Sequence, residues 1–129
     1  MSTFDDTDAR PMKLVFCCRR RPELTAEEFQ GYWLENHAAL VRSVRATIPS
    51  MTRYVQSHTM FGPLTDGVRD SRGTGDPYDG VAEIWIDFSA IPEDPESMAE
   101  AMQKLLDDEL SFVDMSRSSV FITKEHVIF

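Results

Sequence analysis

Long hydrophobic runs, basic residues and metal motifs are scarce in this chain. No apolar stretch approaches the roughly 20 residues that a membrane-spanning helix needs, so we expect no membrane partner. Lys and Arg number 13 against 22 Asp and Glu, which gives a formal net charge of −9. An acidic surface repels phosphate backbones, and nucleic acid is therefore not an expected partner. The CxxC, HExxH and glycine-rich phosphate-loop patterns are absent, so the sequence predicts no metal and no cofactor.

Cysteine is also rare, and the two cysteines, Cys17 and Cys18, are adjacent. Neighbouring residues of a strand point to opposite faces, so we expect no disulfide between them. The N-terminus lacks the basic start and apolar stretch of a secretory signal. These features favour a cytoplasmic protein in which both cysteines are packing residues rather than nucleophiles.

What the chain does contain is typical of one globular domain. It has 129 residues, of which 42% are hydrophobic and 27% charged. Residues 1–11 are polar and carry Asp5, Asp6 and Asp8, so we expect a disordered acidic tail. The remaining residues, 12–129, form the predicted domain.

Hydrophobic periodicity and turn residues predict six elements in this domain. They are a strand over 13–19, a helix over 25–46, strands over 51–59 and 80–88, a helix over 96–112 and a strand over 120–128. Residues 60–78 are rich in Gly, Pro and Asp and predict a long loop, which is either a lid or disordered. The order βαββαβ predicts an α+β, ferredoxin-like sandwich. Two helices cover only one face of a four-stranded sheet, so we expect a homodimer in which the bare faces pack together.

The first predicted helix carries a histidine on its apolar face. Thr25 and Glu28 have the spacing of a capping box at its start. An apolar stripe then follows at spacings of three and four, made by Phe29, Trp33, His37, Leu40 and Val44. An imidazole in such a stripe either hydrogen-bonds a buried partner or faces a cavity and does chemistry.

Several segments together resemble the EthD domain family. They are residues 21–25 (RPELT), 29–38 (FQGYWLENHA), 51–55 (MTRYV), 78–85 (YDGVAEIW), 108–109 (DE) and 112–114 (FVD). The resemblance covers about residues 12–129, and the pairing of Trp33 and His37 with Asp79-Gly80 at a strand start is its most specific part. It implies a dimeric α/β barrel, a superfamily that includes lyases, dehydratases, isomerases, cofactor-free monooxygenases and haem proteins. Some fungal members of the EthD group resemble dehydratases of polyketide-type aromatic substrates.

Five residues are candidates for the chemistry. An imidazole can take or give a proton at neutral pH, so His37 is the candidate general acid or base, with a core histidine bonded to the backbone as the alternative. Arg53 and Tyr54 point to opposite faces of their strand, and His58 shares a face with Tyr54. The row of side chains that faces the helices, whether it holds Arg53 or Tyr54 and His58, can stabilise an oxyanion. The alternative for Arg53 is a surface ion pair, and the alternative for His58 is a solvated position in the loop. Glu83 lies in an apolar strand and is either catalytic or paired with an arginine.

Other residues are expected to shape the site. The aromatic side chains of Phe29, Tyr32, Trp33 and Trp85 are core residues that also line any cavity for a flat ligand. His126 lines either the pocket or the dimer interface. Asp108, near the end of the second helix, is expected to be a solvated helix-end charge, and Glu109 to lie on the inner face of that helix.

These observations favour a cofactor-independent lyase, dehydratase or isomerase that acts on a hydrophobic, oxygenated, aromatic or polyketide-like molecule by acid–base chemistry. Two alternatives stay open. One is cofactor-free oxygenation of a phenol or anthrone. The other is a non-catalytic dimer that binds a small ligand or haem, with His37, His58 or His126 as axial ligand.

Overall fold

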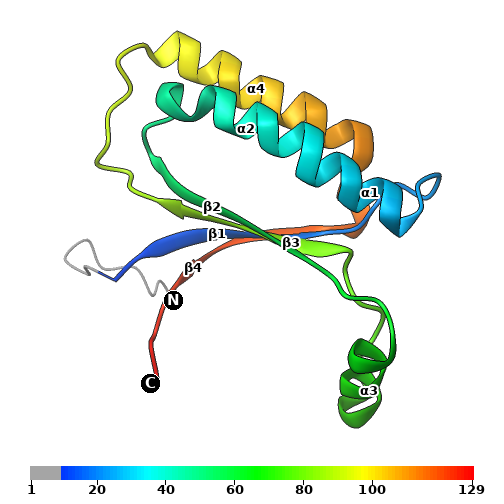
Figure 1. Ribbon diagram of the computed structural model, residues 1–129. Coiled ribbons are helices and arrows are strands. Elements are labelled where there is room, and N and C mark those ends of the chain that lie inside the picture. Colours follow the sequence, from blue (N-terminus) through cyan, green and yellow to red (C-terminus); the bar gives the residue numbers. More distant parts are fainter. Residues whose placement is uncertain (1–9) are drawn as a thin grey trace.

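A four-stranded antiparallel sheet carries two long helical segments on one face, as the computed structural model in Figure 1 shows; the structure describes residues 10–129. The strands are β1 (Met12–Cys18), β2 (Met51–His58), β3 (Gly80–Ile86) and β4 (Ser119–Lys124), in the spatial order β2-β3-β1-β4. The helices over the sheet are α1 (Ala26–Tyr32), α2 (Ala38–Val44) and α4 (Pro95–Phe112). This is the predicted ferredoxin-like βαββαβ fold. The predicted tail falls mostly on residues 1–9, which lie outside the described part.

The helix expected over 25–46 is interrupted by a π-helical turn, η1 (Trp33–His37), and ends in the 3₁₀ turn η2 (Arg45–Thr47). Its start is as predicted, because the Glu28 amide donates to Thr25 Oγ1 at 3.1 Å and the Glu28 carboxylate accepts from the Thr25 amide at 3.0 Å. In η1 the Ala38 amide donates to the Trp33 carbonyl, five residues back. The wider turn shifts the buried stripe, so that Val41 rather than Leu40 follows His37 in the interior.

The core forms where the π-helical turn meets the sheet and α4. Phe29, Trp33 and Phe112 are each at most 2% exposed, and the Phe29 ring centre lies 5.5 Å from the centres of both other rings. Trp33 lies directly on the backbone of Gly80, where a Cβ atom would come within 2.4 Å of Trp33 Cζ3 and 2.7 Å of the Ser57 carbonyl oxygen. Glycine is therefore required at the start of β3 by close approach of the tryptophan.

Residues 60–78, expected to be a loop, contain the helix α3 (Pro63–Arg72), which projects beyond the sheet on the side away from α1, α2 and α4 (Figure 1). Pro63 occupies the first helical turn, and Gly73 ends the helix in the left-handed conformation with φ of 63°. Both residues are helix boundaries here rather than loop residues.

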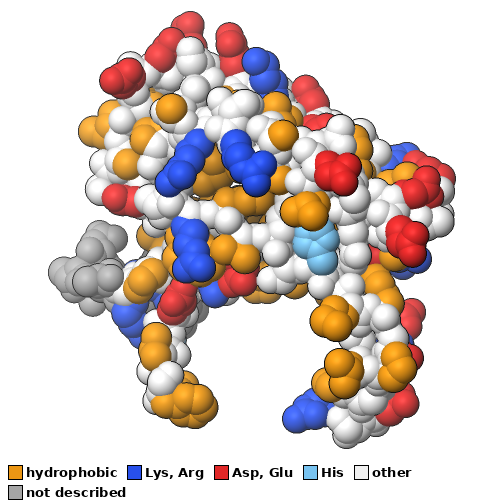
Figure 2. Space-filling view, viewed as in Figure 1, with side chains coloured by type: hydrophobic (Ala, Val, Ile, Leu, Met, Phe, Trp, Pro, Cys, Tyr) orange, Lys and Arg blue, Asp and Glu red, His pale blue; other side chains and the backbone are white. Residues whose placement is uncertain are grey.

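The last strand is shorter than the predicted 120–128, because β4 ends at Lys124 where its partner β1 begins. The side chains of Val127, Ile128 and Phe129 are exposed beyond it. In Figure 2 two projecting segments, this one and the α3 segment, flank the sheet face that carries no helix. A short 3₁₀ turn, η3 (Met115–Arg117), connects α4 to β4.

Candidate functional site

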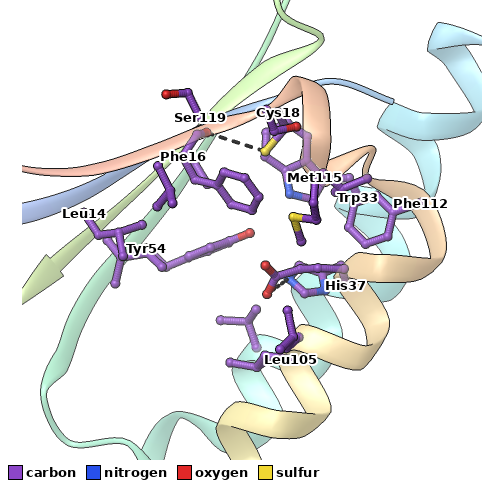
Figure 3. Close-up of a pocket in the computed structure, with 18 of the residues that line it drawn as sticks. Leu14, Phe16, Cys18, Trp33, His37, Tyr54, Leu105, Phe112, Met115 and Ser119 are labelled. Atoms are coloured by element: carbon purple, nitrogen blue, oxygen red, sulfur yellow. Dashed lines mark hydrogen bonds and ion pairs between the residues drawn. The ribbon is translucent and has the colours of Figure 1, made fainter. Parts of the chain in front are cut away.

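A cavity of about 400 Å³ lies between the helices and the covered face of the sheet (Figure 3). Its walls are mostly apolar and come from all four strands, η1, α2, α4 and η3; they include Leu14, Phe16, Trp33, Val41, Ile84, Leu105, Phe112 and Met115. Four titratable side chains line it as well, namely Cys18, His37, Tyr54 and Glu109. An apolar cavity with a few converging polar groups is the usual form of a small-molecule site.

His37 is fixed in this cavity by a carboxylate from the neighbouring helix. The π-helical turn η1 presents its ring towards α4, where Nδ1 lies 2.8 Å from Asp108 Oδ2. The ring also packs against Phe112, with 5.3 Å between ring centres, and the side chain is 5% exposed. Because a carboxylate accepts a hydrogen bond from Nδ1–H, Nε2 is the nitrogen left to face the cavity.

Asp108 itself is held by a second donor. The Tyr32 hydroxyl donates to Asp108 Oδ1, and this bond raises the pKa of Tyr32. The expectation that Asp108 is a solvated helix-end charge is wrong, because the side chain turns towards η1 and orients the histidine. Asp108 reaches His37 because α4 packs against the helical segment that carries His37. The two residues are 71 positions apart in the sequence.

Glu109 stands on the other side of the imidazole, and it was not among the site residues predicted from the sequence. Its Oε2 lies 3.9 Å from Nε2 of His37. Burial raises the pKa of Glu109 to about 7, and the nearby charge of Asp108 adds to the effect. One feature of the sequence could have indicated Glu109 as a site residue: it is a carboxylate on the otherwise apolar inner face of the second predicted helix.

Tyr54 reaches the cavity from β2. Burial raises its pKa to about 12, so the phenol keeps its proton at neutral pH. Its oxygen accepts a hydrogen bond from Gln56 Nε2 at 3.0 Å, and the same amide donates to the carbonyl of Trp33 at 2.9 Å. Gln56 therefore joins the phenol to the π-helical turn that carries His37.

His58 lies next to this network but outside the cavity lining. Its ring stacks on Trp33, with centres 4.6 Å apart, and burial lowers its pKa. Because both Gln56 amide hydrogens are donated, Gln56 Oε1 accepts from His58 Nε2 at 2.8 Å. His58 thus supports Tyr54 through Gln56 and does not face the ligand space.

Three other predicted site residues do not line the cavity: Glu83 and Trp85 lie on the opposite, bare face of the sheet, and Arg53 lies at its β2 edge, over Trp85. Ala82 and Ile84 line the cavity, so their neighbours in the strand point away from it. Glu83 pairs with Lys13 at 2.5 Å, and the guanidinium of Arg53 covers the ring of Trp85 at 4.6 Å. The structure does not bring these three together with His37.

The remaining predicted residues are divided between core, cavity and surface. Phe29 is fully buried behind Trp33, and Trp33 lines the cavity. His126 is exposed beyond β4, where its Nδ1 lies 2.6 Å from Arg10 Nη1. Cys18 lines the cavity, and burial raises its pKa to about 12, which keeps the thiol protonated and unreactive.

Within residues 10–129, no group of three or more His, Cys, Asp and Glu side chains is arranged to hold a metal ion. In the same part of the chain, none of the helices has both the length and the apolar character needed to cross a bilayer.

Comparison with known proteins gives one family and a set of similar folds. Residues 21–116 match the family described as EthD domain. An EthD-like protein from Ralstonia eutropha superposes with a TM-score of 0.52 at 14% identity, over 93% of this chain and 96% of that one.

Two further structures are of dimeric proteins of unknown function. One, with a ferredoxin-like fold, is from Bacteroides fragilis, with a TM-score of 0.55, 8% identity and coverage of 89% and 96% of this and that chain. The other, a dimeric ferredoxin-like protein from Thermobifida fusca, has a TM-score of 0.54, 11% identity and coverage of 90% and 92%. A search among curated proteins found no match. At these identities the structures support the fold.

Proposed function

This chain belongs to the EthD domain family, and from that premise and the cavity beside His37 we propose that it is a cofactor-independent lyase, dehydratase or isomerase. The proposed substrate is a hydrophobic, oxygenated molecule of aromatic or polyketide type. One observation carries the proposal. The imidazole has one nitrogen anchored by Asp108 and the other directed at a partly buried carboxyl group of raised pKa, Glu109, in an apolar cavity.

This arrangement suits the movement of a proton to and from carbon. His37 Nε2 removes a proton from the carbon next to a carbonyl, and the bonding electrons pass to the carbonyl oxygen as an enolate. Tyr54 donates a hydrogen bond to that oxygen, since its pKa of about 12 keeps it protonated. Glu109, in its protonated form, gives its proton to a leaving hydroxyl, which departs as water, or to the next carbon.

The two proton transfers together leave no net charge behind. His37 gains a proton as Glu109 loses one, so the pair ends as an imidazolium beside a carboxylate, 3.9 Å apart before substrate binds. A transfer back from His37 to Glu109 restores the starting state. Charge-neutral exchange is favourable in a cavity of this kind, because isolated charges are costly in apolar surroundings.

The haem alternative is less well supported by the histidines. His37 directs its two ring nitrogens at carboxylates, His58 lies flat on Trp33 outside the cavity lining, and His126 is exposed beside Arg10. None of these positions favours an axial ligand inside the cavity. Cofactor-free oxygenation uses the same base, and the experiment below separates it from proton transfer.

We further propose that the protein is a homodimer formed by the bare faces of two sheets. The exposed side chain of Phe121 on β4, and the projecting α3 and C-terminal segments, leave apolar surface that a second copy would cover. The dimeric proteins from Bacteroides fragilis and Thermobifida fusca that share the fold support this arrangement.

The test is catalysed hydrogen exchange on anthrone, a flat aromatic ketone with an acidic methylene. Under nitrogen in deuterated buffer, the wild-type protein is expected to raise the rate of deuterium incorporation at the methylene above the buffer rate. His37→Ala should return the rate to that of buffer, whereas His126→Ala, at an exposed position, should leave it unchanged. Full exchange in the His37→Ala protein contradicts the proposal. In air, incorporation of label from molecular oxygen identifies oxygenation instead.

A further inference from the structure

A second hollow, of about 310 Å³, adjoins the cavity at the edge of the sheet. It is lined by Ala38, Val41, Arg42, Arg45, Met51, Thr52, Arg53 and Tyr54. Three of these residues, Val41, Met51 and Tyr54, also line the cavity that holds His37. The two spaces therefore adjoin, and the proposed catalytic phenol borders both of them.

The second hollow gathers positive charge in an acidic protein. Its lining contains three arginines and no Asp or Glu. Figure 2 shows basic side chains around an opening between α2 and the sheet, with apolar atoms inside it. For Arg42 and Arg45, no carboxylate of residues 10–129 lies within ion-pair distance, and Arg53 contacts only the ring of Trp85.

This clustering is unexpected for a chain with 22 acidic residues and 13 basic ones. Elsewhere in residues 10–129, Arg20 pairs with Asp79, Arg21 with Glu23 and Arg69 with Asp76. Arg19 and Arg72 instead donate to backbone carbonyls and to a serine hydroxyl. Three neighbouring guanidinium groups repel one another, and an anion between them removes that cost.

The cavity beside His37 has the opposite character. No Lys or Arg lines it among the described residues, and residues 1–9 contain neither type. The carboxyl group of Glu109 lines it, and that of Asp108 contacts the imidazole from outside the lining. An anionic group would be unfavourable there, since it would be desolvated without a cation and placed beside a carboxylate.

We propose that Arg42, Arg45 and Arg53 form an anion-binding subsite, which holds a carboxylate or phosphate of the substrate while its uncharged body lies against His37 and Tyr54. This inference rests on the proposed function and adds the charge of the substrate and its orientation. Guanidinium groups bind both anions through paired N–H donors. If the bound anion is a carboxylate, it is part of the substrate itself. If it is a phosphate, it is part of a carrier group attached to the substrate.

Three naphthalene probes of similar size test the subsite: 2-naphthamide, 2-naphthoate and 2-naphthyl phosphate. Their affinities for the full-length protein are measured by isothermal titration calorimetry at pH 8 and low salt. We expect at least one anion to bind about tenfold more tightly than the amide, and this advantage to shrink at high salt. The anion with the larger advantage identifies carboxylate or phosphate as the source.

The double variant Arg42→Gln/Arg45→Gln should lose the advantage of the anion and keep the affinity for the amide. Both arginines are exposed, so the fold is expected to persist, which circular dichroism checks. The matched control is Arg72→Gln/Arg117→Gln, which changes the net charge equally at exposed positions outside both spaces.

Each outcome decides the question. Equal affinities of the three probes for the wild-type protein, or equal losses in the two double variants, overturn the subsite and leave the proposed acid–base function standing. Absence of binding by all three probes at millimolar concentration overturns the subsite and also counts against an aromatic substrate.

Discussion

His37 and Asp108 are joined across two helices by a 2.8 Å contact between Nδ1 and Oδ2, although 71 residues separate them in the chain. The histidine comes from a π-helical turn and the carboxylate from the last third of α4. Since the carboxylate fixes the tautomer and direction of the ring, the proposed role of Nε2 depends on a residue that does not line the cavity.

Asp108→Asn should therefore lower anthrone exchange by a factor on the order of 10² or more, because an amide does not fix the histidine tautomer as a carboxylate does. Asp107→Asn is the matched control, since Asp107 is the neighbouring residue, is exposed and bonds only Gln103 among the described residues. Exchange rates of the purified variants are compared at one pH. A rate within twofold of wild type for Asp108→Asn contradicts the proposed function of this pair.

Glu109 should make the stability of the protein depend on pH. Its folded-state pKa of about 7 lies above the ordinary value of 4.5, so the folded protein binds this proton more tightly than the unfolded chain. The free energy of unfolding is then expected to fall by on the order of 2–3 kcal/mol as pH rises from about 4.5 to about 7, and to level off above. Urea denaturation of wild type and Glu109→Gln across this range measures the effect. The glutamine variant should lack this component, and parallel curves would show that the carboxyl is not perturbed.

Gly80→Ala should destabilise the fold by about 1–3 kcal/mol, because the new methyl group meets the Trp33 ring and the Ser57 carbonyl oxygen at distances that neither can relieve easily. Gly67→Ala is the control. It lies within α3, where a methyl group would have no neighbouring atom within 4 Å, and the change should be neutral or slightly stabilising. Chemical denaturation followed by tryptophan fluorescence compares them. Equal stability of the two variants would contradict the close packing at the start of β3.

Gln56→Leu should reduce both stability and exchange. The change removes the donor to the Trp33 carbonyl and to the Tyr54 oxygen, and leaves the His58 ring without its acceptor. The expected loss is about 1–3 kcal/mol in unfolding free energy, with a fall in anthrone exchange as the π-helical turn loses its support. Gln103→Leu, on the exposed side of α4, is the control. If a folded Gln56→Leu protein exchanged anthrone hydrogens at the wild-type rate, the hydrogen bonds of Gln56 would not be needed for the proposed chemistry.

Phe121→Glu should yield monomers if the bare faces of two sheets pack together. Phe121 lies beside Val15 in the register of β1 and β4, and it is 46% exposed in the single chain. A carboxylate there would be buried without a partner in the dimer. Light scattering at micromolar concentration measures the mass of wild type and variant, with Met102→Glu, at an exposed position of α4 away from the bare face, as a comparison for added charge. A monomeric wild-type protein would contradict the dimer.

The fold could be predicted from the sequence because its signals are local. The apolar helix stripes and the short apolar strand segments follow one another in the order βαββαβ, and few chain topologies can pack these elements around one core. The helix α3 escaped prediction since Gly62, Pro63 and Gly73 resemble loop residues, and the apolar side chains of Leu64 and Val68 remain exposed. The sequence of α3 therefore has no apolar stripe that must be buried in the core and would have predicted a helix.

The site was predicted only where one side chain carried the signal. His37 was evident as an imidazole in an apolar stripe, whereas Asp108 and Glu109 acquire their environment from contacts across the fold. The alternation of side chains along a strand predicted that Arg53 and Tyr54 lie on opposite faces of the sheet, but it did not predict which of the two faces the helices. That depends on the register of β2, which shifts between Met51 and Arg53.

The π-helical turn makes the position of the imidazole sensitive to the count of residues rather than only to their kind. Such a turn holds one extra residue, so removing one residue from 34–36 would let the segment close as an ordinary α-helix while α2 beyond it kept nearly the same face towards the sheet. The imidazole, which lies inside the turn, would be displaced relative to Asp108 while the sheet and α4 stayed as they are. Gain or loss of a single codon is thus a route by which the contact between histidine and aspartate can appear or disappear on an otherwise unchanged scaffold.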